Sequence, residues 1–367
     1  MDYDTYYDKV HGAWLGRVAG SHFGAPLEFR PFSSIQKKYC AGGQKEITGY
    51  VKPVNADQVN DDEIYEIVGL VALETKGVDI TSEDIAREWD RRLYKMQFTA
   101  ERVALRNIRK GIMPPDCASE ANGNIWYDAI GGQMKADIWG LIAPNCPEIA
   151  ARYAEIDGQV AHQGVGVDGE IFVAGMISNA FGESDVRELI HKSLELLPPE
   201  SAYRQFVEKT ESIYQKHQGW RPAREEMLQE WHKIRQMLRK SAAFRRRVVF
   251  LNRVLGGLHV LPNAGIIVLS LLYGADDATD PFGRAVCIGG MMALDTDCNC
   301  GNIGAIMGAM LGAKGIPPAW QDPLKDTFHT YVKGYEHWKI SELAHRMCQA
   351  GIKVLAAECP EKRIVSS

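Results

Sequence analysis

The segment 298–312 carries small residues at four-residue steps, and this pattern constrains the fold more than any other feature. One series is Gly301, Ala305 and Ala309, and a second is Gly304, Gly308 and Gly312. Glycine costs about 0.8–1.0 kcal/mol per helical position relative to alanine. A helix that retains several glycines therefore gains from close contact with a neighbouring helix, which small residues allow. The pattern predicts a buried central helix that starts just after an acidic cluster.

The helical period of apolar residues dominates the rest of the chain. Thr81 is the expected N-cap of one helix, because Asp84 follows three residues later and completes a capping box. Few segments show the alternation of period two that marks a strand. We therefore predict an all-α fold, a compact multi-helix bundle. The expected helices cover 6–24, 61–75, 81–94, 99–109, 147–156, 171–181, 185–196, 263–273, 281–291, 298–311 and 341–357.

We expect a single domain over 1–367, because no repeat, low-complexity tract or Pro/Gly/Ser-rich linker divides the chain. The length of 367 residues permits one large domain. The segment 199–240 carries many charges between its apolar residues, which indicates a solvated helical surface.

Composition excludes several classes of protein. The net charge of -5 and pI near 6.1 lack the basic footprint of a nucleic-acid-binding protein. The first ten residues are charged and aromatic, which argues against a signal peptide, and no apolar run reaches the ~20 residues of a membrane span. The eight cysteines follow no repeated spacing, so we expect free thiols and a cytoplasmic location. Cys298 and Cys300 lack the second ligand pair that a structural zinc site needs.

Two acidic clusters, Asn60-Asp61-Asp62-Glu63 and Asp295-Thr296-Asp297-Cys298, each open an expected helix. For either cluster alone, capping of the helix N-terminus is the better explanation. Two clusters change this balance, because paired like charges repel each other unless a cation screens them. Oxygens from two helix starts, brought together by folding, form a cup for one or two hard divalent cations.

Further motifs extend this pattern over residues 8–322, and their order resembles the ADP-ribosylglycohydrolase superfamily, which includes the glycohydrolase that reactivates dinitrogenase reductase. The motifs are Gly12-Ala-Trp-Leu-Gly16, Gly24-Ala-Pro-Leu-Glu28, Asp61-Asp62, Ala293-Leu-Asp295-Thr-Asp297, Gly304 to Gly312, and Ile316-Pro-Pro-Ala-Trp320. The resemblance implies an orthogonal all-α bundle and a binuclear Mg²⁺ (or Mn²⁺) centre. It also implies hydrolysis at the anomeric carbon of a ribose, as in removal of ADP-ribose from a protein side chain.

The resemblance assigns metal binding to the two acidic pairs. Asp61, Asp62, Asp295 and Asp297 fall on the family's metal-binding acids, and Asn60 stands where a threonine is usual. An amide oxygen is also a ligand for a hard cation.

The same resemblance suggests catalytic and substrate-binding residues. Glu28 falls on a glutamate near the scissile bond, so Glu28 and Asp62 are the leading candidates for activating water. Gln133 lies in a segment that matches a Gly-rich loop, and His162 lies in one that lines the substrate cleft. A structural role for His162 stays equally open. Asp168 and Glu170 follow among glycines, where we favour a solvated loop over the cleft wall.

The chain departs from the family pattern at three positions around the acids. Ser21 replaces an aspartate, and Glu63 and Cys298 each replace a threonine. Cys298 is a soft ligand, poorly suited to Mg²⁺. Glu63 is either an extra ligand or base, or a first-turn residue stabilised by the helix dipole. We expect both side chains on the substrate side of the site, and we interpret 199–240 as a helical insertion.

These observations predict a metal-dependent hydrolase that cleaves a ribosyl bond, with an ADP-ribosyl group as the first choice of substrate. Partners would be a small ribosyl molecule or an ADP-ribosylated protein, without nucleic acid or membrane. Two alternatives stay open: a hydrolase of a small furanosyl glycoside such as a nucleoside, and a non-catalytic ADP-ribose binder. A purely structural helical protein agrees least with the paired acids. The leaving group, the number of cations and the oligomeric state are left open.

Overall fold

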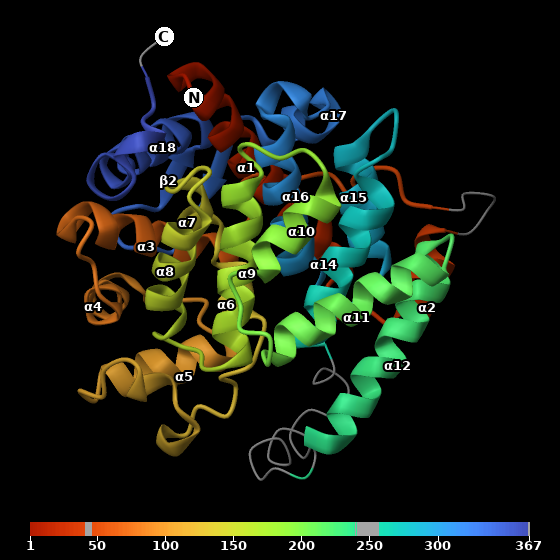
Figure 1. The fold of residues 1–367 in the computed structure, drawn as a ribbon, viewed down its shortest axis with the longest axis horizontal. Coiled ribbons are helices and arrows are strands. Elements are labelled where there is room, and N and C mark those ends of the chain that lie inside the picture. Colours follow the sequence, from red (N-terminus) through yellow and green to blue (C-terminus); the bar gives the residue numbers. More distant parts are fainter. Residues whose placement is uncertain (41–45, 239, 241–256, 366–367) are drawn as a thin grey trace.

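Helices form nearly all of the regular structure in this computed structural model, which describes residues 1–40, 46–238, 240 and 257–365 (Figure 1). The all-α prediction is confirmed. The α-helices are α1 (Tyr3–Gly24), α2 (Phe32–Tyr39), α3 (Asp62–Lys76), α4 (Ser82–Arg92), α5 (Thr99–Ile108), α6 (Gly131–Met134), α7 (Asp137–Leu141), α8 (Pro147–Gly158), α9 (Val165–Asn179), α10 (Val186–Leu194), α11 (Ala202–Lys216), α12 (Trp220–Leu238), α14 (Val260–Gly274), α15 (Pro281–Met291), α16 (Thr296–Leu311), α17 (Pro318–Gln321) and α18 (Ile340–Glu358). A small antiparallel sheet joins β1 (Thr327–His329) to β2 (His337–Lys339).

The centre of the bundle is an antiparallel pair of helices, α1 and α16, which lie side by side in Figure 1. Their backbones touch: a Cβ atom at Gly16 would overlap the carbonyl oxygen of Gly304, and one at Gly20 would overlap that of Cys300. Nearly all of α16 is buried, as the four-residue pattern predicts. The pairing sets the C-terminal end of α1 beside the N-terminal end of α16, where the Thr296 hydroxyl donates to the Gly24 carbonyl at 2.8 Å.

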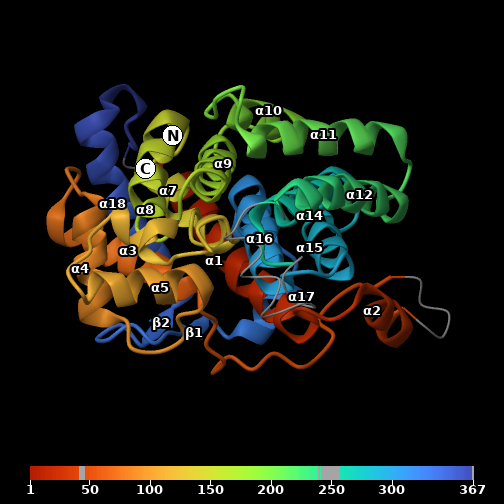
Figure 2. The same cartoon turned by 90° about the horizontal axis from the view of Figure 1, so that it is seen from below.

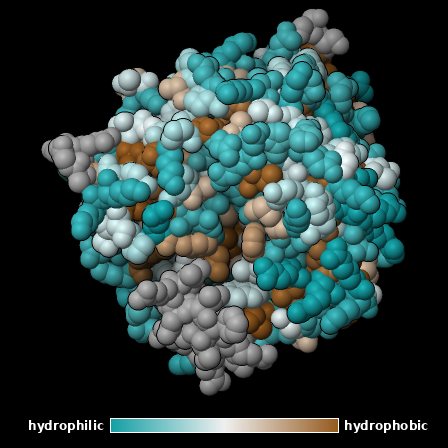
Figure 3. Space-filling model, turned by 180° about the vertical axis from the view of Figure 1, so that it is seen from behind, coloured by the Kyte–Doolittle hydropathy of each residue, from teal (hydrophilic) through white to brown (hydrophobic). Residues whose placement is uncertain are grey.

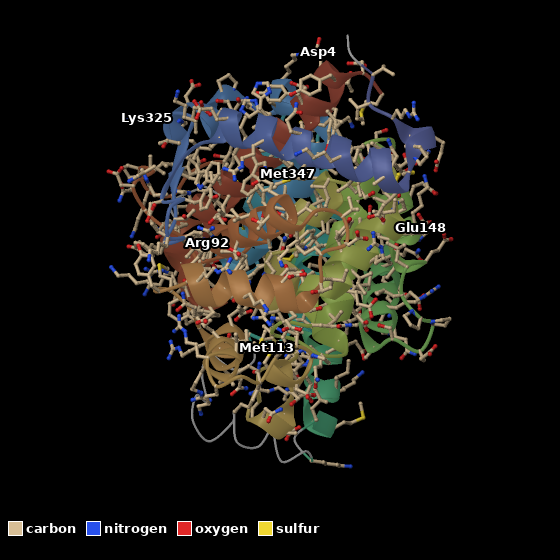
Figure 4. All side chains as sticks on the ribbon, turned by 90° about the vertical axis from the view of Figure 1, so that its left-hand side faces the viewer. Asp4, Arg92, Met113, Glu148, Lys325 and Met347 are labelled. Carbon is tan, nitrogen blue, oxygen red and sulfur yellow. The ribbon has the colours of Figure 1, made fainter. Side chains whose placement is uncertain are left out.

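Further helices surround this pair in layers. Helix α15 packs on α16, and α14 packs on both. Helices α11 and α12 cover α14 from outside, as Figure 2 shows. On the opposite side, α18 packs on α1 and α3. Figure 4 shows α18, where Met347 is labelled, lying above the orange helices and the labelled Arg92.

Local sequence signals account for several helix boundaries. The capping box is confirmed: the Thr81 side chain accepts from the Asp84 backbone N–H, and the Asp84 carboxylate accepts from that of Thr81. Helix α15 spans the predicted residues. The short helix α2 and the two-stranded sheet lie outside the predicted set, because each is only a few residues long and lacks a clear period.

One predicted loop is wrong. Helix α9 begins at Val165, so Asp168 and Glu170 are helical, and Glu170 is fully buried. The glycines that suggested a loop instead allow close packing, since a Cβ at Gly166 would lie 2.5 Å from the Tyr127 carbonyl oxygen. The side-chain amine of Lys135 pairs with the Glu170 carboxylate at 2.6 Å.

The surface is mostly hydrophilic, as expected for a chain with 24% charged residues. Hydrophilic residues cover most of the face in Figure 3, and apolar residues gather around a hollow near its centre. Among the described helices, none is long and apolar enough to cross a membrane. The eight cysteines carry free thiols. The segment 199–240 contains α11 and α12, whereas its status as an insertion, and the single-domain organisation, stay predictions.

The contact between α1 and α16 leads to a stability prediction. Gly16→Ala should lower the free energy of unfolding by about 1–3 kcal/mol or more, because the added methyl meets a backbone carbonyl that cannot rotate away. Urea denaturation followed by circular dichroism measures this change. Gly219→Ala is the matched control, since its Cβ would meet open space. Equal unfolding free energies for the two variants would contradict the packing argument.

Candidate active site

A cavity of about 450 Å³ opens where the end of α1 meets the starts of α3 and α16. Five of its lining residues are carboxylic acids that come from four parts of the chain. The lining residues are Ala25, Glu28, Phe29, Gln58, Val59, Asn60, Asp61, Met96, Phe98, Thr99, Glu101, Ile130, Gly131, Met134, Leu258, Asp295, Asp297 and Cys298. The two acidic clusters of the sequence therefore share one cavity.

The acids at the two helix starts do not cap their helices. Asp61 and Asp295 occupy the N-cap positions of α3 and α16, yet neither side chain accepts a capping hydrogen bond. In contrast, the side chains of Asp2 and Asp185 do accept such bonds at α1 and α10. The capping explanation, which was the main competitor of metal binding, thus fails at both clusters.

Open carboxylate oxygens point to a ligand in this cavity. Asp295, Asp297 and Cys298 each offer one atom within 4.8 Å of the others. The Oδ1 atoms of Asp295 and Asp297 are buried without a hydrogen-bond partner, and the Asn60 amide donates to Asp297 Oδ2 at 3.4 Å. Buried charged oxygens are costly unless a partner compensates them. The donor set therefore fits a cation.

The electrostatics of the cavity favour protonated acids in the absence of a cation. Burial, together with repulsion from Asp297, raises the pKa of both Asp61 and Asp295 well above the ordinary value. The same two causes raise the pKa of Glu28 to about 8, although its side chain stays accessible to solvent. A divalent cation would lower each of these pKa values and displace the protons.

Asp62 differs from its neighbour Asp61. Its side chain is fully buried and does not line the cavity. Its Oδ2 lies 3.2 Å from Arg17 Nη2, and its Oδ1 accepts from the Cys298 thiol at 3.2 Å. Burial raises the pKa of Asp62, and Arg17 opposes this shift. Its assignments as metal ligand and base stay predictions.

Arg17 is the centre of a buried ionic network that sequence reasoning missed. Its guanidinium lies 3.3 Å from Glu66 Oε1 and 3.3 Å from Asp137 Oδ2, while Glu63 lies 4.0 Å away. Glu63 is buried beside Arg17 and outside the cavity lining. Burial is the main cause that raises the pKa of Asp137 to about 7. A charged residue among the small and apolar residues of α1 was the available signal.

The other two predicted substrate contacts also lie behind the cavity wall. His162 is fully buried, and its Nε2 is hydrogen-bonded to Glu101 Oε1 at 2.8 Å. Gln133 is fully buried and accepts from the Tyr203 hydroxyl at 2.6 Å. Direct contact of either side chain with substrate stays a prediction, whereas Cys298 does line the cavity. Sequence reasoning missed Glu101, because nothing in its local sequence distinguishes it from a surface helix residue.

Strained backbone gathers around the same cavity. Ala293 and Leu294, directly before Asp295, have φ angles of 67° and 75°. Phe29, directly after Glu28, has φ 49°, and its N–H donates to the Leu294 carbonyl at 3.0 Å. A non-glycine residue with such a positive φ angle costs about 1–3 kcal/mol of conformational free energy. Such residues persist where the surrounding structure requires them, commonly at functional sites. This strained contact holds Glu28 and Asp295 on adjoining loops.

An all-α bundle that directs carboxylates from separate helices into one cavity has the features of a hydrolytic enzyme with an acidic centre. The family model described as ADP-ribosylglycohydrolase matches residues 2–354, so the chain belongs to the ADP-ribosylglycohydrolase family and is a glycosyl hydrolase. A solved structure described as an "ADP-ribosylglycohydrolase-related protein complex" shares the fold, with a TM-score of 0.61 and 17% identity over 95% of this chain and 99% of that chain. No curated protein sequence matches.

The raised pKa of Asp137 predicts a pH dependence of stability. Its folded pKa of about 7 lies above the ordinary value of 3.8, so the folded protein holds this proton more tightly than the unfolded chain does. Stability from this group is therefore complete below about pH 4 and is lost as pH rises toward 7. Replacing Asp137 with Asn should remove this loss. We expect the unfolding free energy of Asp137→Asn to rise relative to the wild type between pH 4 and 7 in urea titrations; a constant difference would contradict this.

Proposed function

We propose that this chain hydrolyses the bond at the anomeric carbon of an ADP-ribosyl group, with one or two Mg²⁺ or Mn²⁺ ions in the acidic cavity. The observation that carries the proposal is the convergence of Asp61, Asp295 and Asp297 on one cavity in a chain of this family. Asp61 and Asp295 stand at helix starts there, yet their side chains accept no capping hydrogen bond. Membership of the family supports hydrolysis of a glycosidic bond.

The donor chemistry suits a hard cation. Asn60, Asp61, Asp295 and Asp297 line the cavity, and Mg²⁺ and Mn²⁺ prefer the carboxylate and amide oxygens that these residues carry. A bound cation would hold the vicinal hydroxyls of the ribose and stabilise the negative charge that develops in the site. The sulfur of Cys298 lies beside these oxygens and suits a hard cation poorly.

The chain's own acids would manage the proton of the attacking water. Glu28 lies on the cavity wall with a solvent-accessible side chain, so water can reach its carboxylate. As the bond to C1 breaks, the leaving group takes the bonding electron pair and the ribose develops oxocarbenium character. Ionised Glu28 accepts a proton from the water that attacks C1, and a proton is taken up by the leaving group, which restores the ionised acid. Glu101 faces the same cavity, and its hydrogen bond to His162 holds it in place.

The cation-centred proposal predicts the effect of removing one ligand. Asp297→Ala should lose Mn²⁺ binding in calorimetry and lower hydrolysis by about 10²-fold or more, since a ligand is missing. Hydrolysis is measured on ADP-ribosylated protein, O-acetyl-ADP-ribose and nucleosides. Turnover of nucleosides alone would favour the furanosyl alternative, and tight ADP-ribose binding without product would favour the non-catalytic binder. Undiminished turnover by Asp297→Ala would contradict the metal-centred mechanism.

The role of Glu28 is tested separately. Glu28→Gln should lower kcat by about 10²–10⁴-fold, which is the usual contribution of a general base. Mn²⁺ should still bind, and the unfolding curve should match that of the wild type because the side chain is accessible to solvent. Full activity in Glu28→Gln would assign the base to another acid. Glu342→Gln, an accessible glutamate on α18, controls for the loss of one charge.

A further inference from the structure

We propose that Arg17 takes the place of a second cation, so that the acidic cavity holds a single hard divalent cation per chain. This inference rests on the proposed function, because it concerns the cation of the same site. It gives Arg17 the role of a positioning residue, which acts through Asp62 and the start of α3.

The acids at this end of the bundle divide into two groups. Asp61, Asp295 and Asp297 line the cavity, and none of them forms an ion pair with a described Lys, Arg or His. Asp62, Glu66 and Asp137 lie behind the cavity wall and surround Arg17. The first group is open to a cation from solvent, whereas the second group already has a positive charge beside it, the guanidinium of Arg17.

The guanidinium of Arg17 is built into the protein on every side. Its side chain is 1% exposed. Its nitrogens lie 3.2–3.3 Å from carboxylate oxygens of Asp62 and Glu66 on α3 and of Asp137 on α7. It also donates to the Met134 carbonyl. Arginine stays charged at all ordinary pH values. The Arg17 side chain therefore keeps its positive charge over the whole ordinary pH range.

Both oxygens of Asp62 already face another group. Arg17 Nη2 lies 3.2 Å from Oδ2 in an ion pair, and the Cys298 thiol donates to Oδ1. A second divalent cation at Asp62 would have to displace both, approach a fixed positive charge, and accept a soft sulfur neighbour. Like charges in a buried site repel strongly, and thiol sulfur is a poor ligand for Mg²⁺ and Mn²⁺. Among the described residues, the place that remains for a cation is beside the cavity-facing acids.

Arg17 also positions the acids that remain free. By holding Asp62, it fixes the first turn of α3, and the Asp62 backbone N–H donates to Asn60 Oδ1 at 3.4 Å. Asn60 in turn contacts Asp297. Through these contacts Arg17 orients Asn60 and Asp61 toward the cavity without touching the cation.

The count of bound ions tests the inference on the wild-type protein. After removal of metal by chelation, titration with Mn²⁺ should saturate at one ion per chain. The electron paramagnetic resonance spectrum should show the six lines of an isolated Mn²⁺. Two ions per chain with an exchange-coupled spectrum would overturn this inference and leave the proposed function standing. Hydrolysis that persists in chelator with no Mn²⁺ bound would overturn both.

Two matched variants locate the ion. Asp62→Asn should keep one Mn²⁺ per chain, with an affinity reduced by no more than the roughly 10–100-fold of an outer ligand partner. Asp297→Asn should abolish measurable binding. Equal abolition by both substitutions would overturn the inference, because Asp62 would then be a direct ligand.

The charge of Arg17 is tested by Arg17→Gln, which keeps hydrogen-bonding groups and removes the positive charge. We expect this variant to take up a second Mn²⁺ and to gain more thermal stability from Mn²⁺ than the wild type does. A folded variant that still binds one ion, with an unchanged spectrum, would overturn the role of the charge. If the variant does not fold, the ion count of the wild type decides.

Discussion

The direct backbone contact between α1 and α16 is the constraint on which the site depends. Glycines at matching positions of the two helices allow carbonyl groups of one to touch the other. Because the helices are antiparallel, this contact fixes the end of α1 against the start of α16. Glu28 and Asp295, which are more than 260 positions apart in the chain, therefore meet at one cavity. A Cβ atom at Gly16 or Gly304 would overlap the backbone of the facing helix and push the two helices apart.

Electrostatics impose the second constraint. Folding buries at least six carboxylates around this end of the bundle, and burial raises the pKa of most of them. Arg17 compensates the acids behind the cavity wall, and the acids on the cavity side are left without a cationic partner among the described residues. This imbalance supports the proposed cation in the cavity, since the acids there lack the ion pairs that Arg17 gives to the others.

Strain and second-layer contacts complete the arrangement. The left-handed residues before Asp295 and after Glu28 are joined by a backbone hydrogen bond, which ties the two loops together. His162 performs a similar role for Glu101. The site thus combines acids on loops and helix starts with buried groups that hold those acids in place.

Local signals in the amino-acid sequence were sufficient for the helical class, the Thr81 capping box, the buried helix with its glycine face, and the acids at two helix starts. Each of these follows from residues within a few positions of one another. The sequence offered no means of finding Glu101, the partners of Arg17 or the burial of Glu170, or of distinguishing the surroundings of Asp61 from those of Asp62. Those features depend on neighbours distant in the chain: the rotation of α3 turns Asp61 toward the cavity and Asp62 toward Arg17. Periodicity predicts which face of a helix is apolar, whereas the direction of each acid is set by what packs against it.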